Sequence, residues 1–131
     1  MRKFVPKKID AIHSRELFEQ LFIDDKGQLD EFLKSLSGTT YLSEYRTLLT
    51  YMEYFGDGNR LPDTKYKDLT PSKEIIKEHE FKSKHLRIYA IQLSGKKLVI
   101  IGGYKNTQPQ DIIRFRSLKE QFLTQQVNKK Q

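Results

Sequence analysis

The stretch from Lys82 to Lys105 most constrains the fold of this chain. Two apolar runs, Leu86 to Leu93 and Leu98 to Ile101, flank the pair Ser94-Gly95. A serine-glycine pair between two β-prone runs is a strong signal for a tight β-hairpin. We therefore predict a hairpin here and expect the other elements to pack around it.

A two-residue loop at Ser94-Gly95 would set the register of both strands, because side chains alternate between the two faces. Counting back from the loop gives one wholly apolar face, with the pairs Ala90–Val99, Ile88–Ile101 and Leu86–Gly103. The opposite face is mixed, with the pairs Ile91–Leu98, Tyr89–Ile100, Arg87–Gly102 and His85–Tyr104. This register predicts that His85, Arg87 and Tyr104 lie together.

The length of 131 residues fits one domain, 1–131, with a core of its own. The chain has no cysteine, so we expect neither disulfides nor thiolate metal sites. The N-terminus lacks the apolar middle region of a signal peptide, and no apolar run approaches the ~20 residues of a membrane span. We expect a soluble, cytoplasmic protein that makes no contact with membranes.

The net charge of +7 is unevenly distributed along the chain. Residues 1–60 hold nine Lys and Arg against ten Asp and Glu, whereas residues 61–131 hold fifteen against seven. The basic excess therefore belongs to the half that carries the hairpin. Such a field favours a polyanion such as nucleic acid, or an acidic protein, although a solvated lysine-rich surface is an equal alternative.

Hydrophobic periodicity predicts the other elements. Residues 1–13 are expected to be an irregular arm because of Pro6, and residues 124–131 a frayed tail. Residues 14–23 fit either a strand or a helix, and the turn cluster that follows favours the strand. Helices are predicted over 28–36 and 41–55, an irregular segment over 56–73, a strand over 74–81, and a last helix after the proline at 109.

This order of elements predicts an α+β fold. Its sheet is expected to be an antiparallel meander, and the two N-terminal helices, joined by a short loop, are expected to pack as an antiparallel helical hairpin. With the helices on the apolar face of the sheet, the other face should lie largely open.

From about residue 55 to residue 123, the chain resembles the RelE/ParE superfamily of bacterial toxins, and within it the HigB-like and phage-encoded branch. The resemblance rests on GNRLP followed by KDL, the strand EIIKEHEF, the segment HLRIYAI, the strand LVIIGGYKN, and TQPQDIIRFRSL at the entry to the last helix. It is carried by the order and spacing of these segments and implies a RelE-like fold.

The resemblance implies the toxin of a type II toxin-antitoxin system. Such a toxin is a metal-independent endoribonuclease that cleaves mRNA, commonly on the ribosome, and is held inactive by a cognate antitoxin. The 2′-hydroxyl of the RNA is the nucleophile, so no metal or other cofactor is expected. The protein needs cations around the scissile phosphate and groups that transfer protons.

Four residues are the candidate catalytic set. By the resemblance, Arg87 would stabilise the transition state, Tyr104 would stack a base or transfer a proton, and Lys105 would hold phosphate. His85, opposite Tyr104 in the predicted register, has the residue type suited to acid-base work near neutral pH. Further cations are expected to bind nucleic acid: Lys77, Lys82, Lys84, Arg114 and Arg116.

Glu78 and Glu80 depart from the RelE pattern, which has lysines on this strand. A salt bridge from either glutamate to Arg87 would prevent the arginine from acting in catalysis. Two alternatives therefore remain open: a ParE-like inhibitor of DNA gyrase, and a catalytically inactive interaction domain of the same fold. His79 lies between the glutamates, but adjacent strand residues point to opposite faces, so we expect no zinc site there.

Overall fold

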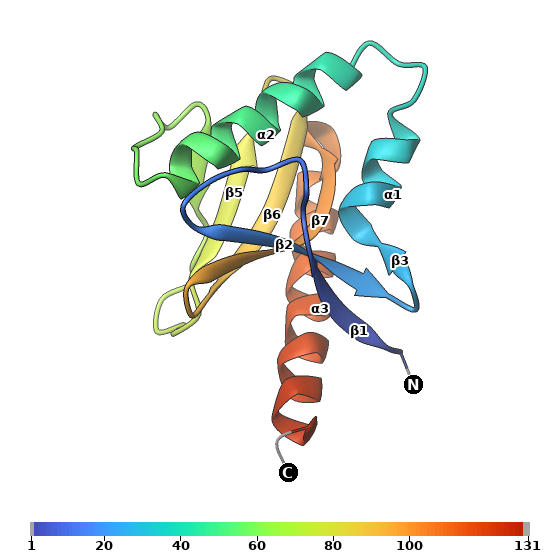
Figure 1. Cartoon of the computed structure of the whole chain (residues 1–131), viewed down its shortest axis with the longest axis vertical. Helices are drawn as coiled ribbons and strands as arrows, with labels where there is room; N and C mark the ends of the chain where they lie inside the picture. Colours follow the sequence, from blue (N-terminus) through green and yellow to red (C-terminus); the bar gives the residue numbers. More distant parts are fainter. Residues whose placement is uncertain (1, 130–131) are drawn as a thin grey trace.

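The computed structural model describes residues 2–129 as an α+β fold with a mixed sheet and three α-helices (Figure 1). The strands are β1 (Phe4–Lys8), β2 (Leu17–Ile23), β3 (Lys26–Gly27), β4 (Tyr66–Asp68), β5 (Glu78–Lys82), β6 (Leu86–Leu93) and β7 (Lys96–Tyr104). The helices are α1 (Gln28–Ser35), α2 (Leu42–Gly56) and α3 (Gln108–Lys129), with a 3₁₀ turn (Lys105–Thr107) before α3.

The sheet runs in the order β1-β2-β7-β6-β5-β4, with the short strand β3 paired to β2. Strands β5 to β7 form the predicted antiparallel meander, and β4 adds an edge strand within the segment 56–73 that was expected to be irregular. Strand β2, however, pairs parallel with β7. The prediction of a wholly antiparallel sheet is therefore wrong, because the N-terminal hairpin joins the far side of the meander.

The N-terminal residues are not an irregular arm, as predicted. Residues 4–8 form β1, which pairs with β2, and Phe4 is buried. Pro6 is tolerated because β1 is an edge strand, where only one side of the backbone needs hydrogen bonds. The prediction of a strand rather than a helix over 14–23 is confirmed by β2.

The β6–β7 hairpin turns at Ser94-Gly95 as predicted, and Gly95 has the positive φ of 73° that favours glycine. The predicted register holds from the turn to the pair Ala90–Val99. Beyond that point a bulge inserts an extra residue into β7, and Arg87 pairs with Gly103 instead of Gly102. Leu86 now pairs with Tyr104, so the prediction that His85 pairs with Tyr104 is wrong.

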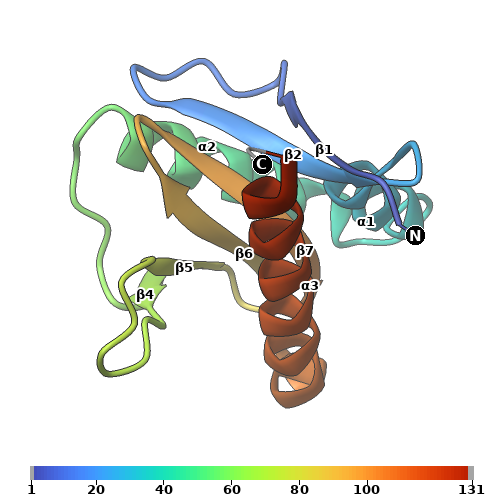
Figure 2. The ribbon, with the colours of Figure 1, turned by 90° about the horizontal axis from the view of Figure 1, so that it is seen from below.

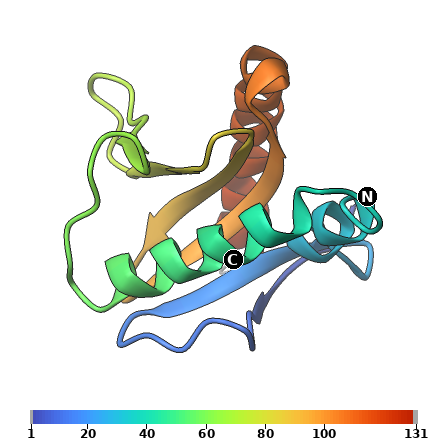
Figure 3. The same cartoon turned by 90° about the horizontal axis from the view of Figure 1, so that it is seen from above.

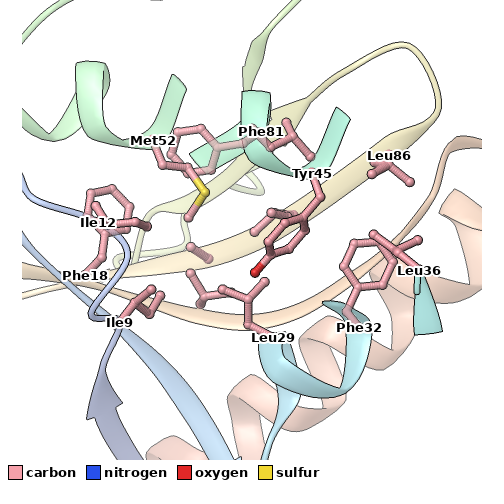
Figure 4. Packing of buried hydrophobic residues seen from close by; sticks show 14 residues of the cluster. Ile9, Ile12, Phe18, Leu29, Phe32, Leu36, Tyr45, Met52, Phe81 and Leu86 are labelled. Atoms are coloured by element: carbon pink, nitrogen blue, oxygen red, sulfur yellow. The ribbon is translucent and has the colours of Figure 1, made fainter. Parts of the chain in front are cut away.

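Helices cover both faces of the sheet. Helices α1 and α2 lie on one face, over a cluster that includes Phe18, Phe32 and Met52 (Figures 3 and 4). Helix α3 lies on the other face, where Phe115 stacks on Tyr89 (Figure 2). The predicted open face is therefore wrong, because the alternate side chains of β6 and β7 are apolar enough on both faces to need cover.

The two N-terminal helices are placed where predicted, but they diverge instead of packing side by side (Figure 1). Phe32 of α1 packs against Tyr45 of α2 at the point where they meet. Elsewhere α1 contacts β2 and β7, and α2 contacts β5 and β6. Each helix therefore uses its apolar stripe on the sheet, and the expected antiparallel helical hairpin is not formed.

The C-terminal helix is confirmed, and it continues through most of the predicted frayed tail to Lys129. Gln125 holds this part of α3 against β1: its side chain accepts a hydrogen bond from the Phe4 backbone (3.2 Å) and donates one to the Arg2 carbonyl (2.8 Å). Residues 130 and 131 of the predicted tail lie outside the described residues.

Gly102 and Gly103 let two helices approach β7 closely from opposite sides. A methyl group at Gly102 would collide with the buried ring of Phe32, and one at Gly103 would collide with the carboxylate of Asp111. We predict that Gly102→Ala lowers the free energy of unfolding by about 1–3 kcal/mol, the usual cost of overpacking.

Gly103→Ala should cost less, because a carboxylate at the end of a side chain moves aside more easily than a packed ring. Urea unfolding of both variants measures the difference. A Gly102→Ala protein with the wild-type midpoint would contradict the close packing described here.

Candidate functional site

The four candidate catalytic residues lie in two groups on opposite faces of the sheet, and the bulge in β7 is what moves Tyr104 away from Arg87. His85 and Tyr104 lie on the side of α2, and Lys105 follows directly after β7. Arg87 lies on the side of α3. The structure therefore brings three of the four residues together and removes the fourth.

A small pocket of about 270 Å³ is lined by His85, Tyr104 and Lys105, together with Tyr41 and Asn106. The Tyr41 ring lies between the other two rings, 5.1 Å from the His85 centroid and 5.8 Å from the Tyr104 centroid. The backbone N–H of Lys105 donates to the His85 carbonyl (2.8 Å), which joins the end of β7 to the start of β6. The pocket thus combines an imidazole, two phenols and an exposed ammonium group.

Glu44 of α2 holds His85 in place. Its carboxylate accepts hydrogen bonds from the His85 backbone N–H (2.6 Å) and from the Ser83 hydroxyl (2.5 Å), and it lies 2.9 Å from His85 Nδ1. Burial acts to raise the pKa of Glu44, but the hydrogen bonds from Ser83 and His85 outweigh it and hold that pKa below its ordinary value of 4.5.

The ionised Glu44 carboxylate can only accept, so Nδ1 of His85 carries the hydrogen in this bond. No residue within 2–129 forms a hydrogen bond with the other nitrogen, Nε2, and 44% of the side chain is exposed. An imidazole oriented in this way has an accepting nitrogen available to a ligand. The sequence analysis missed Glu44, because it lies 41 positions before His85 and no local pattern connects them.

Arg87 is 7% exposed and lies on the face of β6 that α3 covers. Its Nη1 donates to the carbonyls of Ser83 (2.5 Å) and Leu86 (2.8 Å), while its Nε has no partner in the described part of the chain. It forms no ion pair with Glu78 or Glu80, the alternative that the sequence suggested. In this structure the Arg87 guanidinium is therefore neither clamped by a carboxylate nor open to a large ligand.

Glu78 is instead neutralised by α3. It is 1% exposed, accepts from Arg116 Nη2 (2.9 Å) and pairs with Lys119 Nζ (2.8 Å). Arg116 also donates to the Leu69 carbonyl (3.0 Å), which holds the segment before β5. Glu80 accepts a hydrogen bond from Gln108 at the start of α3. Arg116, expected to bind nucleic acid, is thus engaged in a half-buried ion pair.

The other expected nucleic-acid-binding cations are distributed over separate surfaces. Lys77 lies 3.9 Å from Asp68, and Arg114 is exposed on α3 beside a hollow that Lys26 also borders. Lys84 is exposed in the turn before His85, and Lys82 borders a second cavity near Phe55. Only Lys82 and Lys84 are close in sequence to the His85 pocket.

A buried polar chain runs beneath the end of α2. His79, which is 5% exposed, bonds the Tyr66 hydroxyl through Nδ1 (2.5 Å) and the Gln92 Oε1 through Nε2 (3.0 Å). Gln92 in turn donates to Glu16 (2.7 Å), which pairs with the buried Lys97. Burial, with the nearby Lys97 charge, lowers the pKa of His79 from 6.5 to about 4, so it is neutral at physiological pH.

Within the described residues, no group of three histidine, aspartate or glutamate side chains is arranged to hold a metal ion. None of the helices that the structure describes has the length and apolar character needed to cross a membrane. Comparisons with protein-family models, with curated proteins and with solved structures found no match to this chain.

The buried neutral His79 predicts a loss of stability with acidification. Above pH 6.5 the imidazole is neutral in both states; between pH 6.5 and about 4 only the unfolded chain takes up the proton. The free energy of unfolding should therefore fall over this interval, by at most about 3 kcal/mol from this residue.

Urea unfolding at a series of pH values tests this, with His79→Gln as the comparison. The variant should be less stable at neutral pH but should lose less stability between pH 6.5 and 4. If the free energies of unfolding of the two proteins fell equally between pH 6.5 and 4, His79 would not be the group responsible.

The Glu78 cluster predicts a large effect from a single truncation. Glu78→Ala leaves Lys119, itself buried, without its closest counter-charge, so the free energy of unfolding should fall by about 3–5 kcal/mol. The control is Glu31→Ala, which removes an exposed pair with Lys34 and should change stability little. Equal midpoints for the two variants in thermal unfolding would count against a structural role for Glu78.

Proposed function

We propose that this chain is a metal-independent endoribonuclease that cleaves mRNA, and that His85 is its proton-transfer group. The observation that carries the proposal is the Glu44–His85 pair, which fixes the imidazole at Nδ1 while His85 lines a pocket together with Tyr104 and Lys105. A carboxylate that orients an imidazole is a recurrent arrangement for general acid-base catalysis.

The chemistry requires only groups present in the pocket. His85 Nε2 accepts the proton of the RNA 2′-hydroxyl, whose oxygen attacks the adjacent phosphorus. The bond from phosphorus to the 5′-oxygen breaks, and in this proposal the Tyr104 hydroxyl donates a proton to that oxygen. The products are a 2′,3′-cyclic phosphate and a 5′-hydroxyl, and the Lys105 ammonium offsets the negative charge on the phosphate.

The toxin assignment is part of the same proposal and rests on the resemblance of residues 55–123 to RelE/ParE toxins. It adds the ribosome as a site of action and an acidic antitoxin as partner. Arg87 differs from what the resemblance implies: it is buried under α3, so we assign the main catalytic role to His85 instead. That burial also favours the second candidate, an interaction domain of this fold without catalysis.

Replacement of His85 tests the proposal most directly. His85→Ala should lower kcat for cleavage of an oligoribonucleotide by about 10²–10⁴, the usual contribution of a general acid or base. His13→Ala is the matched control, since His13 is exposed and lies outside the pocket. Glu44→Gln should give a smaller loss, because it weakens the orientation of the ring but leaves the imidazole.

Activity should persist in excess chelator, since no step uses a metal. Expression of the wild-type chain alone should arrest growth and leave cut transcripts, whereas His85→Ala should do neither. Equal cleavage by wild type and His85→Ala would refute the proposal. Inhibition of DNA supercoiling without RNA cleavage would instead support the gyrase alternative.

A further inference from the structure

A second cavity lies on the same side of the sheet as the His85 pocket, between the C-terminal end of α2 and the edge strand β4. It has a volume of about 990 Å³. Phe55 and Tyr66 line it, with their rings stacked at 4.5 Å and 24°. Three cations border it: Arg60, Lys67 and Lys82.

The charge of this cavity is not balanced from within. None of its three cations forms an ion pair in the part of the chain that the structure describes, whereas one of its two carboxylates, Asp68, is engaged by Lys77 and Thr70. Asp63 is the other. Three cations thus face one uncompensated carboxylate, so the cavity attracts anions.

The aromatic floor of the cavity is rigidly held. The Tyr66 hydroxyl donates to His79 Nδ1, and the neutral His79 donates from Nε2 to Gln92, which is anchored to Glu16. A ring fixed by a buried hydrogen-bond chain loses little freedom when a ligand stacks on it. An aromatic surface bordered by cations is the combination that binds single-stranded nucleic acid, in which bases stack and phosphates pair.

The end of β5 and the turn after it lead along the chain from this cavity to His85. Lys82 borders the cavity and precedes His85 by three residues, so their Cα atoms are at most about 11 Å apart. The exposed Lys84 lies between them. A single strand of RNA that enters the His85 pocket can therefore continue over these lysines toward Phe55 and Tyr66.

We propose that the cavity at Phe55 and Tyr66 is a second RNA-binding subsite, which holds nucleotides adjacent to those cleaved at His85. This inference rests on the proposed ribonuclease function for the choice of RNA as the ligand, but it concerns binding and not cleavage. It assigns Arg60, Lys67 and Lys82 to phosphate contacts and the two aromatic rings to base stacking.

The test measures binding of fluorescent 2′-O-methylated RNA, which lacks the nucleophilic hydroxyl and so is not cleaved. A trinucleotide is compared with an oligonucleotide of about twelve residues over a range of salt concentrations. Arg60→Gln/Lys67→Gln should leave trinucleotide binding unchanged. It should weaken the longer RNA on the order of tenfold near 0.1 M salt and reduce its salt slope by about 1.4, the value for two lost phosphate contacts.

The matched control is Lys8→Gln/Arg15→Gln, which removes the same charges from exposed positions beside a different hollow. Its salt slope for the longer RNA should equal that of wild type. Equal losses in the two double variants would show a diffuse electrostatic effect and overturn the subsite. Equal affinity of the wild type for the short and the long RNA would also overturn the subsite.

Two further arms separate this inference from its alternatives. If polyglutamate of matched length displaces the long RNA at equal concentration, the cavity is a site for an acidic protein segment and the RNA assignment fails. His85→Ala protein should retain the dependence on RNA length. If it does, while the wild type cleaves nothing, the ribonuclease proposal fails and the RNA-binding subsite stands.

Discussion

The extra residue in β7 is the constraint on which the rest of this structure depends. It directs both Ile100 and Ile101 into the cluster beneath α3 and reverses the alternation of every residue after them. Tyr104 then lies beside α2, and Gly103 lies opposite Arg87. The two consecutive glycines, one toward each face, leave room for α1 and α3 to approach the same strand from opposite sides.

Helix α3 is held to the sheet by charge as well as by apolar packing. Glu78 is compensated by Arg116 and Lys119, and such a buried group is tolerated only when its charge is matched and its hydrogen bonds are made. Three other polar atoms beneath the helix have no partner within residues 2–129: Glu80 Oε1, Arg87 Nε and the Tyr89 hydroxyl. Within residues 61–131 the buried cations Arg87, Lys97 and Lys119 are nearly balanced by the buried carboxylates of Glu78 and Glu80, so most of the basic excess of this half remains on the surface.

The candidate functional residues lie on the opposite face of the sheet, at the two ends of α2. At its N-terminal end, Glu44 orients His85 in a pocket with Tyr104 and Lys105; at its C-terminal end, Phe55 and Tyr66 form an aromatic floor among cations. Helix α2 thus supplies a residue to both places. A single rigid element that orders an imidazole at one end and a stacking surface at the other suits an extended polyanionic ligand.

The sequence by itself determined the elements with strong local signals. The Ser94-Gly95 turn, helices α1 and α2, the strand β2 and the proline-led start of α3 all follow from turn chemistry and periodicity, which act between near neighbours. It also placed His85, Tyr104 and Lys105 in one group, but with Arg87, which lies on the other face of the sheet. Only the tertiary structure decided which residues surround them. The bulge, the parallel β2–β7 pair and the Glu44–His85 contact join residues far apart in the chain. A shift of one residue in register moves a side chain to the other face of a sheet, and the bulge in β7 moved Tyr104 to the face of α1 and α2. Arg87 keeps its predicted face of β6, which α3 covers.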